Sequence, residues 1–267
     1  MQRLLRRNLP ISRQRVITCD CIKQLFASVC SSVFYLRVAR SSIYSTTTTN
    51  SDTQTKDMAV TRTNAISKQK FDYLLVLDFE ATCDNKSRLI PQEIIEFPCL
   101  KVNAKTLQIE SQFHQYVQPQ VHKQITPFCT ELTGIIQDMV DGKPHLKETL
   151  EAFHEWMLSE GLMKDGVSSI FVTCGDWDLK TMLPSQCKYF NIQPHPVFSR
   201  WINIKKSFAN LTGVFPRGMM GMLSKLNIPH KGRHHSGIDD CKNIASILIT
   251  MIQQGHIFQQ TSHPEKL

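Results

Sequence analysis

The sequence lacks the cysteine patterns that mark small metal-binding or disulfide-stapled domains. It contains nine cysteines, yet those beyond residue 50 form no C-x-x-C pair and no mixed Cys/His spacing suited to zinc. A disulfide framework or a zinc finger is therefore not expected, and we interpret these thiols as buried or incidental groups of a reducing compartment. The six are Cys83, Cys99, Cys129, Cys174, Cys187 and Cys241.

Acidic residues are nearly missing from the first fifty positions, which hold eight Lys or Arg and one acid, Asp20. Most of the formal charge of +8 therefore belongs to this segment, and the rest of the chain is close to neutral. Charge alone consequently says nothing about what the globular part binds.

A long hydrophobic run is also missing, because the apolar stretch Leu25–Leu36 is too short to cross a bilayer as a helix. We expect no membrane span. Residues 1–57, rich in Arg, Ser and Thr, suit a mitochondrial transit peptide followed by a disordered linker. The alternatives are a secretory or anchoring signal, and an untargeted disordered tail on a cytoplasmic protein. Met58 offers a second start that would remove the whole segment. We place a further linker at 58–70, a globular domain at 71–260 and a tail at 261–267.

The remaining sequence, with 41% hydrophobic residues in the whole chain, can form a substantial core. Continuous apolar runs predict strands at 73–80, 94–102 and about 107–117, arranged as a meander, and a buried strand at 168–175. Apolar stripes predict helices at 146–158, about 219–226 and 240–254, and another helix opens near Asp178. We interpret 193–216 as a polar, proline-interrupted section. This order predicts an α/β fold with a mixed central sheet flanked by helices.

Two acids stand at the end of the first predicted strand. Asp78 and Glu80 are two positions apart, so both side chains leave a regular strand on the same side. Like charges at that distance destabilise each other unless a cation lies between them.

Helical phase selects two further acids. Asp178 shares a face with Met182 and is expected to point inward, whereas Asp176 suits a cap or loop position. Asp240 lies in line with the apolar stripe from Ile244 to Met251, whereas its neighbour Asp239 lies on the polar face. The inward acids thus number four, each at a strand end or a helix start. Such carboxylate-rich sites suit Mg²⁺ or Mn²⁺, and two ions roughly 4 Å apart form the clamp used in phosphodiester hydrolysis.

The segments LDFEAT, WDLKTML and HSGIDD resemble the three motifs of the DEDDh 3′→5′ exonucleases, a superfamily of RNase H-like (DnaQ-like) fold. The flanking text PQEIIEFP, FCTELTGI and WINIKK is similar to the Eri-type exoribonucleases, particularly their short, prion-protein-interactor branch. The resemblance covers about residues 71–260.

The resemblance implies a role for each matching position. It makes Asp78, Glu80, Asp178 and Asp240 ligands of two Mg²⁺ ions, for which Mn²⁺ can substitute. It makes Glu80 and His235 catalytic, with His235 as the general base. It also implies that the terminal nucleotide is contacted by Glu80, Ala81, Leu132, Thr133, Gly134 and His235. His234 and His235 both stand five residues before an acid; since neighbours in an extended segment face opposite ways, we expect only His235 to face the metals.

The expected function is a metal-dependent 3′→5′ exoribonuclease that acts on RNA with a free 3′ end and releases 5′-mononucleotides. Exonuclease action on DNA and a catalytically idle RNA- or protein-binding module are the alternatives. The basic pair Lys205 and Lys206 suits either phosphate contact or an exposed helix face. The motifs name no protein partner.

Overall fold

The computed structural model describes residues 69–262. The predictions for residues 1–57, the first part of the 58–70 linker and residues 263–267 lie outside this range. No helix within it is long and apolar enough to serve as a membrane span.

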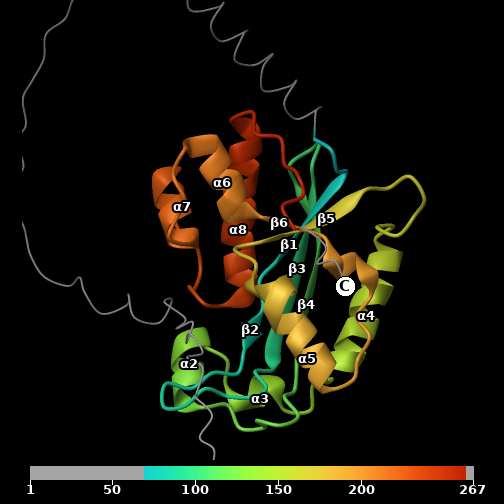
Figure 1. The fold of residues 1–267 in the computed structure, drawn as a ribbon, viewed down its shortest axis with the longest axis vertical. Helices are drawn as coiled ribbons and strands as arrows, with labels where there is room; N and C mark the ends of the chain where they lie inside the picture. Colours follow the sequence, from blue (N-terminus) through green and yellow to red (C-terminus); the bar gives the residue numbers. More distant parts are fainter. Residues whose placement is uncertain (1–68, 263–267) are drawn as a thin grey trace, which may run out of the picture. The chain divides into compact units, whose positions relative to one another are not determined.

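A mixed sheet forms the centre of the domain (Figure 1). Its first half is an antiparallel meander of β1 (Tyr73–Leu77), β3 (Ile94–Asn103) and β4 (Ile109–Tyr116). On the other side of β1, β5 (Ser169–Thr173) and then β6 (Trp201–Asn203) add as parallel strands. The short β2 (Glu80–Ala81) pairs with β3 beyond the end of β1.

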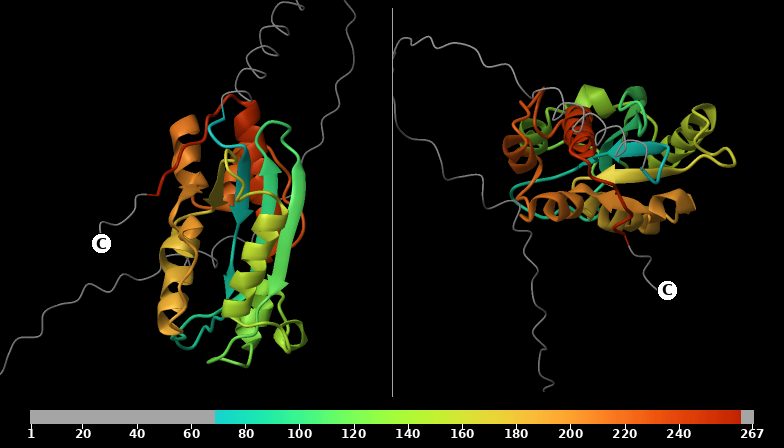
Figure 2. Two further views of the ribbon diagram at one scale, coloured as in Figure 1. Left: turned by 90° about the vertical axis from the view of Figure 1, so that its right-hand side faces the viewer. Right: turned by 90° about the horizontal axis from the view of Figure 1, so that it is seen from above.

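The strand β1 supplies both hydrophobic cores, because successive side chains alternate between the two faces of a sheet. Leu74 and Val76 pack with the helices α6 (Ile204–Thr212), α7 (Met219–Lys225) and α8 (Gly237–Gln253). Leu75 and Leu77 pack on the opposite face with α4 (Leu146–Ser159), the wide turn η1 (Asp178–Met182) and α5 (Leu183–Tyr189). Helices therefore cover both faces of the sheet, as Figure 2 shows from two further sides.

Two small helices lie at the end of the sheet where β2 is found (Figure 1). They are α2 (Pro127–Thr133) and α3 (Gln137–Val140), and they pack around a separate cluster that includes Ile95. The N-cap of α2 is Thr126, whose hydroxyl accepts a hydrogen bond from the N–H of Cys129.

Most predicted elements are confirmed, with two corrections and one addition. The strand predicted at 73–80 stops at Leu77 and resumes at Glu80. The last helix begins at Gly237, three residues before the predicted start. The section 193–216, for which no element bounds were predicted, contains the short helix η2 (Pro196–Ser199), β6 and α6.

The packed part also reaches slightly beyond residue 260. The backbone N–H groups of Thr261 and Ser262 both donate to the carbonyl of Trp201, each at 3.1 Å. The first two residues of the predicted tail thus lie against β6.

Candidate active site

The candidate site begins where β1 leaves its ladder. Asp78 and Phe79 lie between β1 and β2, and the pairing of β2 with β3 is irregular between Glu80 and Ala81. The two acids are therefore not on one regular strand, as the alternation argument assumed. They are nevertheless attached directly to a strand whose residues Leu74–Leu77 are fully buried, so their backbone is held by a rigid core.

Three carboxylates converge at this strand end. One oxygen each from Asp78, Glu80 and Asp240 lie within 4.8 Å of one another. Asp240 comes from the first turn of α8, so the group joins the start of the domain to its last helix. Glu80 is 9% exposed and Asp240 4% exposed, whereas Asp78 is half-buried.

Asp178 faces the same strand end from η1. Its Oδ1 accepts a hydrogen bond from the backbone N–H of Phe79 at 2.9 Å, and the residue is only 4% exposed. Asp176 points elsewhere, because it accepts from the indole N–H of Trp201 at 2.9 Å and pairs with Lys206 at 2.9 Å. The choice of Asp178 as the inward acid is confirmed, although none of its oxygens belongs to the cluster formed by Asp78, Glu80 and Asp240.

The four acids have raised pKa values in the metal-free protein. Burial, followed by the charges of Asp178 and Glu80, holds the pKa of Asp78 well above its usual range. Burial is also the largest cause that raises the pKa of Glu80 to about 9, of Asp240 to about 7 and of Asp178 to about 6. The negative charge of each carboxylate is thus not compensated by the protein, and a divalent cation would compensate it.

One oxygen of this group has no partner among the described residues. Asp240 Oδ2 accepts from the N–H of His235 at 3.0 Å, but Asp240 Oδ1 is buried and unpaired. A buried carboxylate oxygen without a hydrogen bond is costly, so a missing ligand explains it better than packing does. The donor set is made of hard oxygens, which Mg²⁺ and Mn²⁺ prefer. The residues therefore fit a divalent metal site.

A fifth acid, which sequence reasoning missed, positions α8. Glu96 on β3 is 1% exposed and accepts hydrogen bonds from the N–H groups of Gly237 (2.9 Å) and Ile238 (3.2 Å). His114 Nε2 lies 2.8 Å from Glu96 Oε1, the oxygen that also accepts from Ile238. Glu96 thus caps the N-terminus of α8 from a neighbouring strand and fixes the turn that carries Asp240. The available signal was a lone carboxylate inside the apolar strand IIEF.

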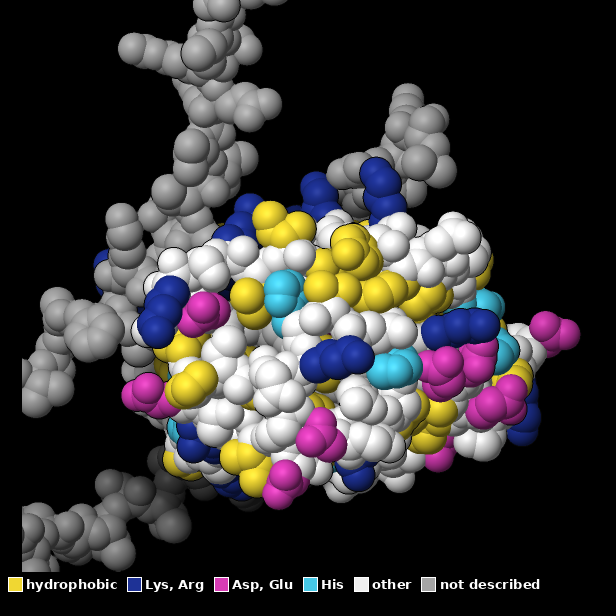
Figure 3. Space-filling model, turned by 90° about the horizontal axis from the view of Figure 1, so that it is seen from below, with side chains coloured by type: hydrophobic (Ala, Val, Ile, Leu, Met, Phe, Trp, Pro, Cys, Tyr) yellow, Lys and Arg dark blue, Asp and Glu magenta, His cyan; other side chains and the backbone are white. Residues whose placement is uncertain are grey.

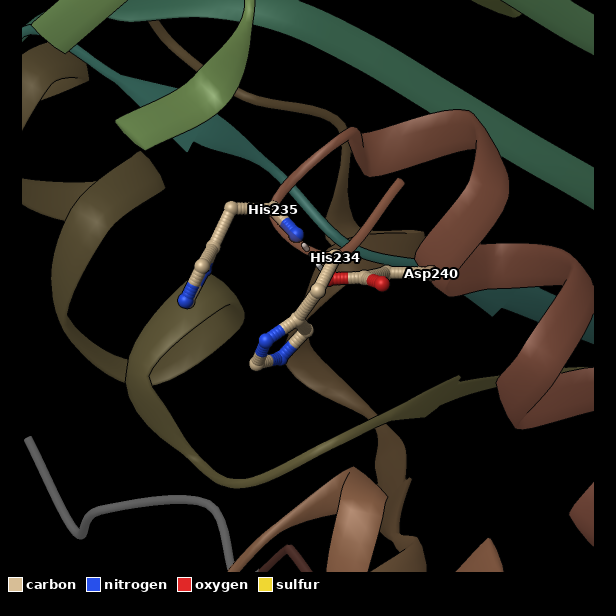
Figure 4. A group of neighbouring side chains, drawn as sticks. All are labelled: His234, His235 and Asp240. Carbon is tan, nitrogen blue, oxygen red and sulfur yellow. Dashed lines mark hydrogen bonds between the residues drawn. The ribbon is translucent and has the colours of Figure 1, made fainter. Parts of the chain in front are cut away.

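The two histidines do not face opposite ways. His235 has a left-handed backbone with φ of 65°, and its ring stacks on that of His234 with centroids 3.9 Å apart. Figure 4 shows both side chains near Asp240, with the backbone of His235 hydrogen-bonded to the carboxylate. The argument from an extended segment was wrong, because a left-handed residue breaks the alternation. Burial is the largest cause that lowers the pKa of His234 to about 4 and that lowers the pKa of His235.

Three of the residues expected to contact a nucleotide, Leu132, Thr133 and Gly134, lie at the end of α2 and directly after it. The thiol of Cys129 reaches the carbonyl of Ala81 at 3.7 Å, which places α2 against the strand that carries Glu80. Thr133 is buried and its hydroxyl donates to the carbonyl of Cys129 at 2.8 Å, so it can contact a ligand only through packing. Leu132 and Gly134 are half-buried.

Arg233 joins α2 to the histidine loop. Its Nη2 donates to the carbonyl of Glu131 at 2.6 Å, and its side chain covers Gly134 so closely that a Cβ there would lie 2.9 Å from Nε. The predicted nucleotide-contacting segment and the histidines are therefore held by one side chain.

A groove of about 320 Å³ has Trp177, the residue before Asp178, in its lining. Trp177 is 39% exposed and Tyr189, farther along, is 55% exposed. The opposite wall comes from the segment 88–92, which includes the exposed Ile90 and the basic Arg88. Sequence reasoning did not single out this groove, because its two walls are distant in the chain.

Comparisons with known proteins agree with this arrangement. Residues 75–248 match the exonuclease family model RNase_T. The chain is 59% identical over 197 residues to ERI1 exoribonuclease 3 of Homo sapiens, covering 73% of this chain and 58% of that protein. It is 44% identical over 191 residues to 3'-5' exoribonuclease 1 of Mus musculus, covering 69% of this chain and 54% of that protein. The chain thus spans between half and two thirds of the length of these relatives.

A solved structure gives the same result. The nuclease domain of 3'hExo, described as a DEDDh family member bound to rAMP, superimposes with a TM-score of 0.69 at 38% identity, covering 72% of this chain and 98% of that one. The protein therefore belongs to the exonuclease family, in its DEDDh branch, and has the mixed α/β nuclease fold that the sequence predicted.

Proposed function

We propose that this protein is a metal-dependent 3′→5′ exoribonuclease that releases 5′-mononucleotides from the 3′ end of RNA. The observation that carries the proposal is the convergence of Asp78, Glu80 and Asp240 around a buried, unpartnered carboxylate oxygen. The exoribonuclease names of the similar proteins and the rAMP in the related nuclease structure support RNA as the substrate.

We assign the metal ligands from this arrangement. Asp78, Glu80 and Asp240 would hold a divalent cation between them, and Asp178 would serve a second, with Mg²⁺ as the expected ion and Mn²⁺ as a substitute. Bound divalent cations polarise the phosphodiester and lower the pKa of a coordinated water. The chain itself supplies the fixed carboxylates, whose backbone is held by β1 and by the capped start of α8.

His235 is the proton acceptor in this proposal. Burial lowers the pKa of its imidazole, so the neutral form that can accept a proton predominates near pH 7. The hydrogen bond from its backbone N–H to Asp240 and the stacked ring of His234 restrict how far the loop can move. One ligand atom of His235 and one carboxylate oxygen of Glu80 each lie within 4.8 Å of a carboxylate oxygen of Asp240.

The terminal nucleotide would lie between the acids and α2. Glu80, Ala81 and His235 would contact it directly, and Leu132, Thr133 and Gly134 would pack against its base and sugar. We assign the next bases of the strand to the groove lined by Trp177 and Tyr189, because exposed aromatic rings stack on bases of any sequence.

The charge distribution favours stacking over general phosphate attraction. On the face drawn in Figure 3, basic and acidic side chains are interspersed with hydrophobic ones. Lys206 is paired with Asp176, whereas the ammonium of Lys205 lies over the ring of Phe215 at 5.9 Å. Of the two lysines considered for phosphate contact, Lys205 is the better candidate.

The full chain should be incubated with 3′-overhang RNA and with DNA of the same sequence, in Mg²⁺, in Mn²⁺ or in EDTA. We expect RNA to be shortened from its 3′ end to 5′-mononucleotides, and EDTA to stop the reaction. Asp240→Asn should abolish activity, whereas the matched variant Asp239→Asn should retain it. A preference for DNA would favour the DNA exonuclease alternative, and tight RNA binding without cleavage would favour an idle binding module.

We also propose, from composition alone, that residues 1–57 direct the protein to mitochondria. A fluorescent reporter fused to these residues should enter mitochondria and be shortened. A diffuse reporter of full length would instead favour a cytoplasmic protein.

A further inference from the structure

A second group of metal-binding atoms lies beside the acidic cluster and has a different chemistry. One ligand atom each from His234, His235 and Asp240 lie within 4.8 Å of one another. Figure 4 shows the three side chains gathered at the start of α8. Two imidazoles and one carboxylate form a nitrogen-rich donor set, unlike the all-oxygen group of Asp78, Glu80 and Asp240.

The loop that carries the histidines is held in place. Asp239 Oδ2 accepts from the backbone N–H of Arg233 at 3.0 Å, and Asp240 Oδ2 accepts from that of His235 at 3.0 Å. Gly232 has a φ of 74°, and any side chain there would collide with the carboxylate of Asp239. The backbone of this loop thus holds the two rings next to each other before a cation binds.

Two buried polar atoms in and beside this group lack a hydrogen-bond partner among the described residues. One is Oδ1 of Asp240, a residue that is 4% exposed and is shared with the all-oxygen group. The other is Nε2 of His230, and the ring of His230 lies 6.1 Å from that of His234. His234 itself is exposed, which leaves a path for an ion from solvent.

The donor set selects the ion. Zn²⁺ binds imidazole nitrogen at about 2.0 Å and carboxylate oxygen at similar distances, commonly with three protein ligands and one water in a tetrahedron. Mg²⁺ prefers six oxygens and has little affinity for imidazole. Ligand atoms in such a tetrahedron are about 3.3 Å apart. The exposed His234 ring must therefore turn out of its stack on His235 before a nitrogen of each ring can face one ion.

We propose that His234, His235 and Asp240 form an inhibitory zinc site that overlaps the active site. Zinc there would occupy the imidazole nitrogen of His235 needed as a proton acceptor, and would compete for Asp240. Zinc binding stands on the geometry alone, whereas the inhibition rests on the proposed exoribonuclease function. His234, to which we give no part in the reaction, would then make the enzyme sensitive to zinc.

Zinc binding should be measured by competition with a chromophoric chelator, using full-length protein stripped with EDTA. We expect the tightest zinc affinity of the wild type to fall by at least roughly tenfold in His234→Ala. The matched control is His195→Ala, because His195 also stacks on another histidine, His154, at 5.0 Å but has no place in this donor set. His195→Ala should bind zinc as the wild type does.

Two further readouts separate the possible failures. Co²⁺ in place of zinc should give a spectrum without thiolate charge-transfer bands; such bands, or unchanged zinc affinity in His234→Ala, would overturn the site. In nuclease assays with Mg²⁺, zinc should inhibit the wild type, and His234→Ala should need at least roughly tenfold more zinc for half inhibition, with each rate expressed relative to the same protein without zinc. If the wild type cleaves no RNA in Mg²⁺ the proposed function fails, but the binding measurements still decide whether the zinc site exists.

Discussion

Glu96, near the start of β3, accepts a hydrogen bond from the backbone N–H of Gly237 at 2.9 Å, so a buried sheet carboxylate caps the helix that carries Asp240. The contact is possible because Gly237 has no side chain. A Cβ at this position would lie 2.8 Å from the carbonyl oxygen of Asp78, 3.0 Å from Pro98 and 3.2 Å from Glu96 Oε2. Helix, strand end and cap therefore meet at one glycine.

Gly237→Ala should destabilise the protein and weaken its metal site. The added methyl group forces α8 away from the backbone of Asp78, a kind of overpacking that costs about 1–3 kcal/mol. The control is Gly221→Ala in α7, where a Cβ meets no atom within 4 Å and helix stability should rise by about 0.4–1 kcal/mol. Thermal unfolding with and without Mg²⁺ measures both effects. Equal melting temperatures for the two variants would contradict the packing argument.

The metal-free protein should lose stability as pH rises. In the folded state the pKa of Asp178 is raised to about 6, of Asp240 to about 7 and of Glu80 to about 9, mainly by burial. The folded state therefore keeps protons on these acids that the unfolded chain has already lost above about pH 4, and by linkage they lower stability up to about pH 9. The lowered pKa values of His234 and His235 act the other way up to about pH 6.5, so the net fall is expected above that pH.

Melting temperatures in EDTA and in Mg²⁺, across this pH range, test that expectation. The gap between the two curves should widen with pH, because metal binds the deprotonated carboxylates of the folded state. Asp78→Asn removes one of the repelling charges, so it should raise the metal-free melting temperature and flatten its dependence on pH. A metal-free curve that rises between pH 7 and pH 9 would refute the electrostatic account.

His235→Ala should lower kcat by roughly 10²–10⁴-fold, the usual contribution of one positioned proton acceptor. His234→Ala should stay within a few-fold of the wild type. The wild-type rate should fall at low pH as His235 becomes protonated, and because burial lowers the pKa of His235, this fall should begin below its ordinary value of 6.5. Single-turnover rates on one RNA across the pH range distinguish the two histidines. If His234→Ala were the inactive variant, His234 would be the proton acceptor.

Trp177→Ala should weaken RNA binding while leaving the chemical step nearly unchanged. Stacking of one base on an aromatic ring contributes about 1–3 kcal/mol, so KM should rise by roughly 10- to 100-fold. Trp177→Phe keeps an aromatic face and should recover most of the affinity. A rise in KM that is equally large with a single dinucleotide would place the effect at the terminal nucleotide instead of the groove.

Much of the fold and site could be predicted because the relevant signals are local. The apolar run Leu74–Leu77 indicated the central strand, and the stripe from Ile244 to Met251 indicated which of two adjacent acids points inward. Asp178 followed from the same kind of phase argument and does face the strand end. The metal and nucleotide roles of these residues stay predictions until activity is measured.

What could not be predicted depends on contacts between distant segments. β6 has three residues and is defined by its pairing with β5, so its own sequence carries little signal. Glu96 looks like an ordinary strand residue until α8 is placed upon it. The stacked histidines result from one left-handed residue, which no spacing rule indicates. For β6 and Glu96, the partner that decides the structure lies in a distant segment of the chain. For the histidines, the backbone conformation of one residue decides it.

The cap between Glu96 and Gly237 has a consequence for synthesis of the protein. The two residues are 141 positions apart, and Asp240 follows the second of them. During translation the strand end with Asp78 and Glu80 leaves the ribosome long before α8 does, so a growing chain carries only part of the acidic group. In the proposed function, such a chain would lack a complete metal site, so it would not cleave the RNA around it, including its own message, until the last helix docks.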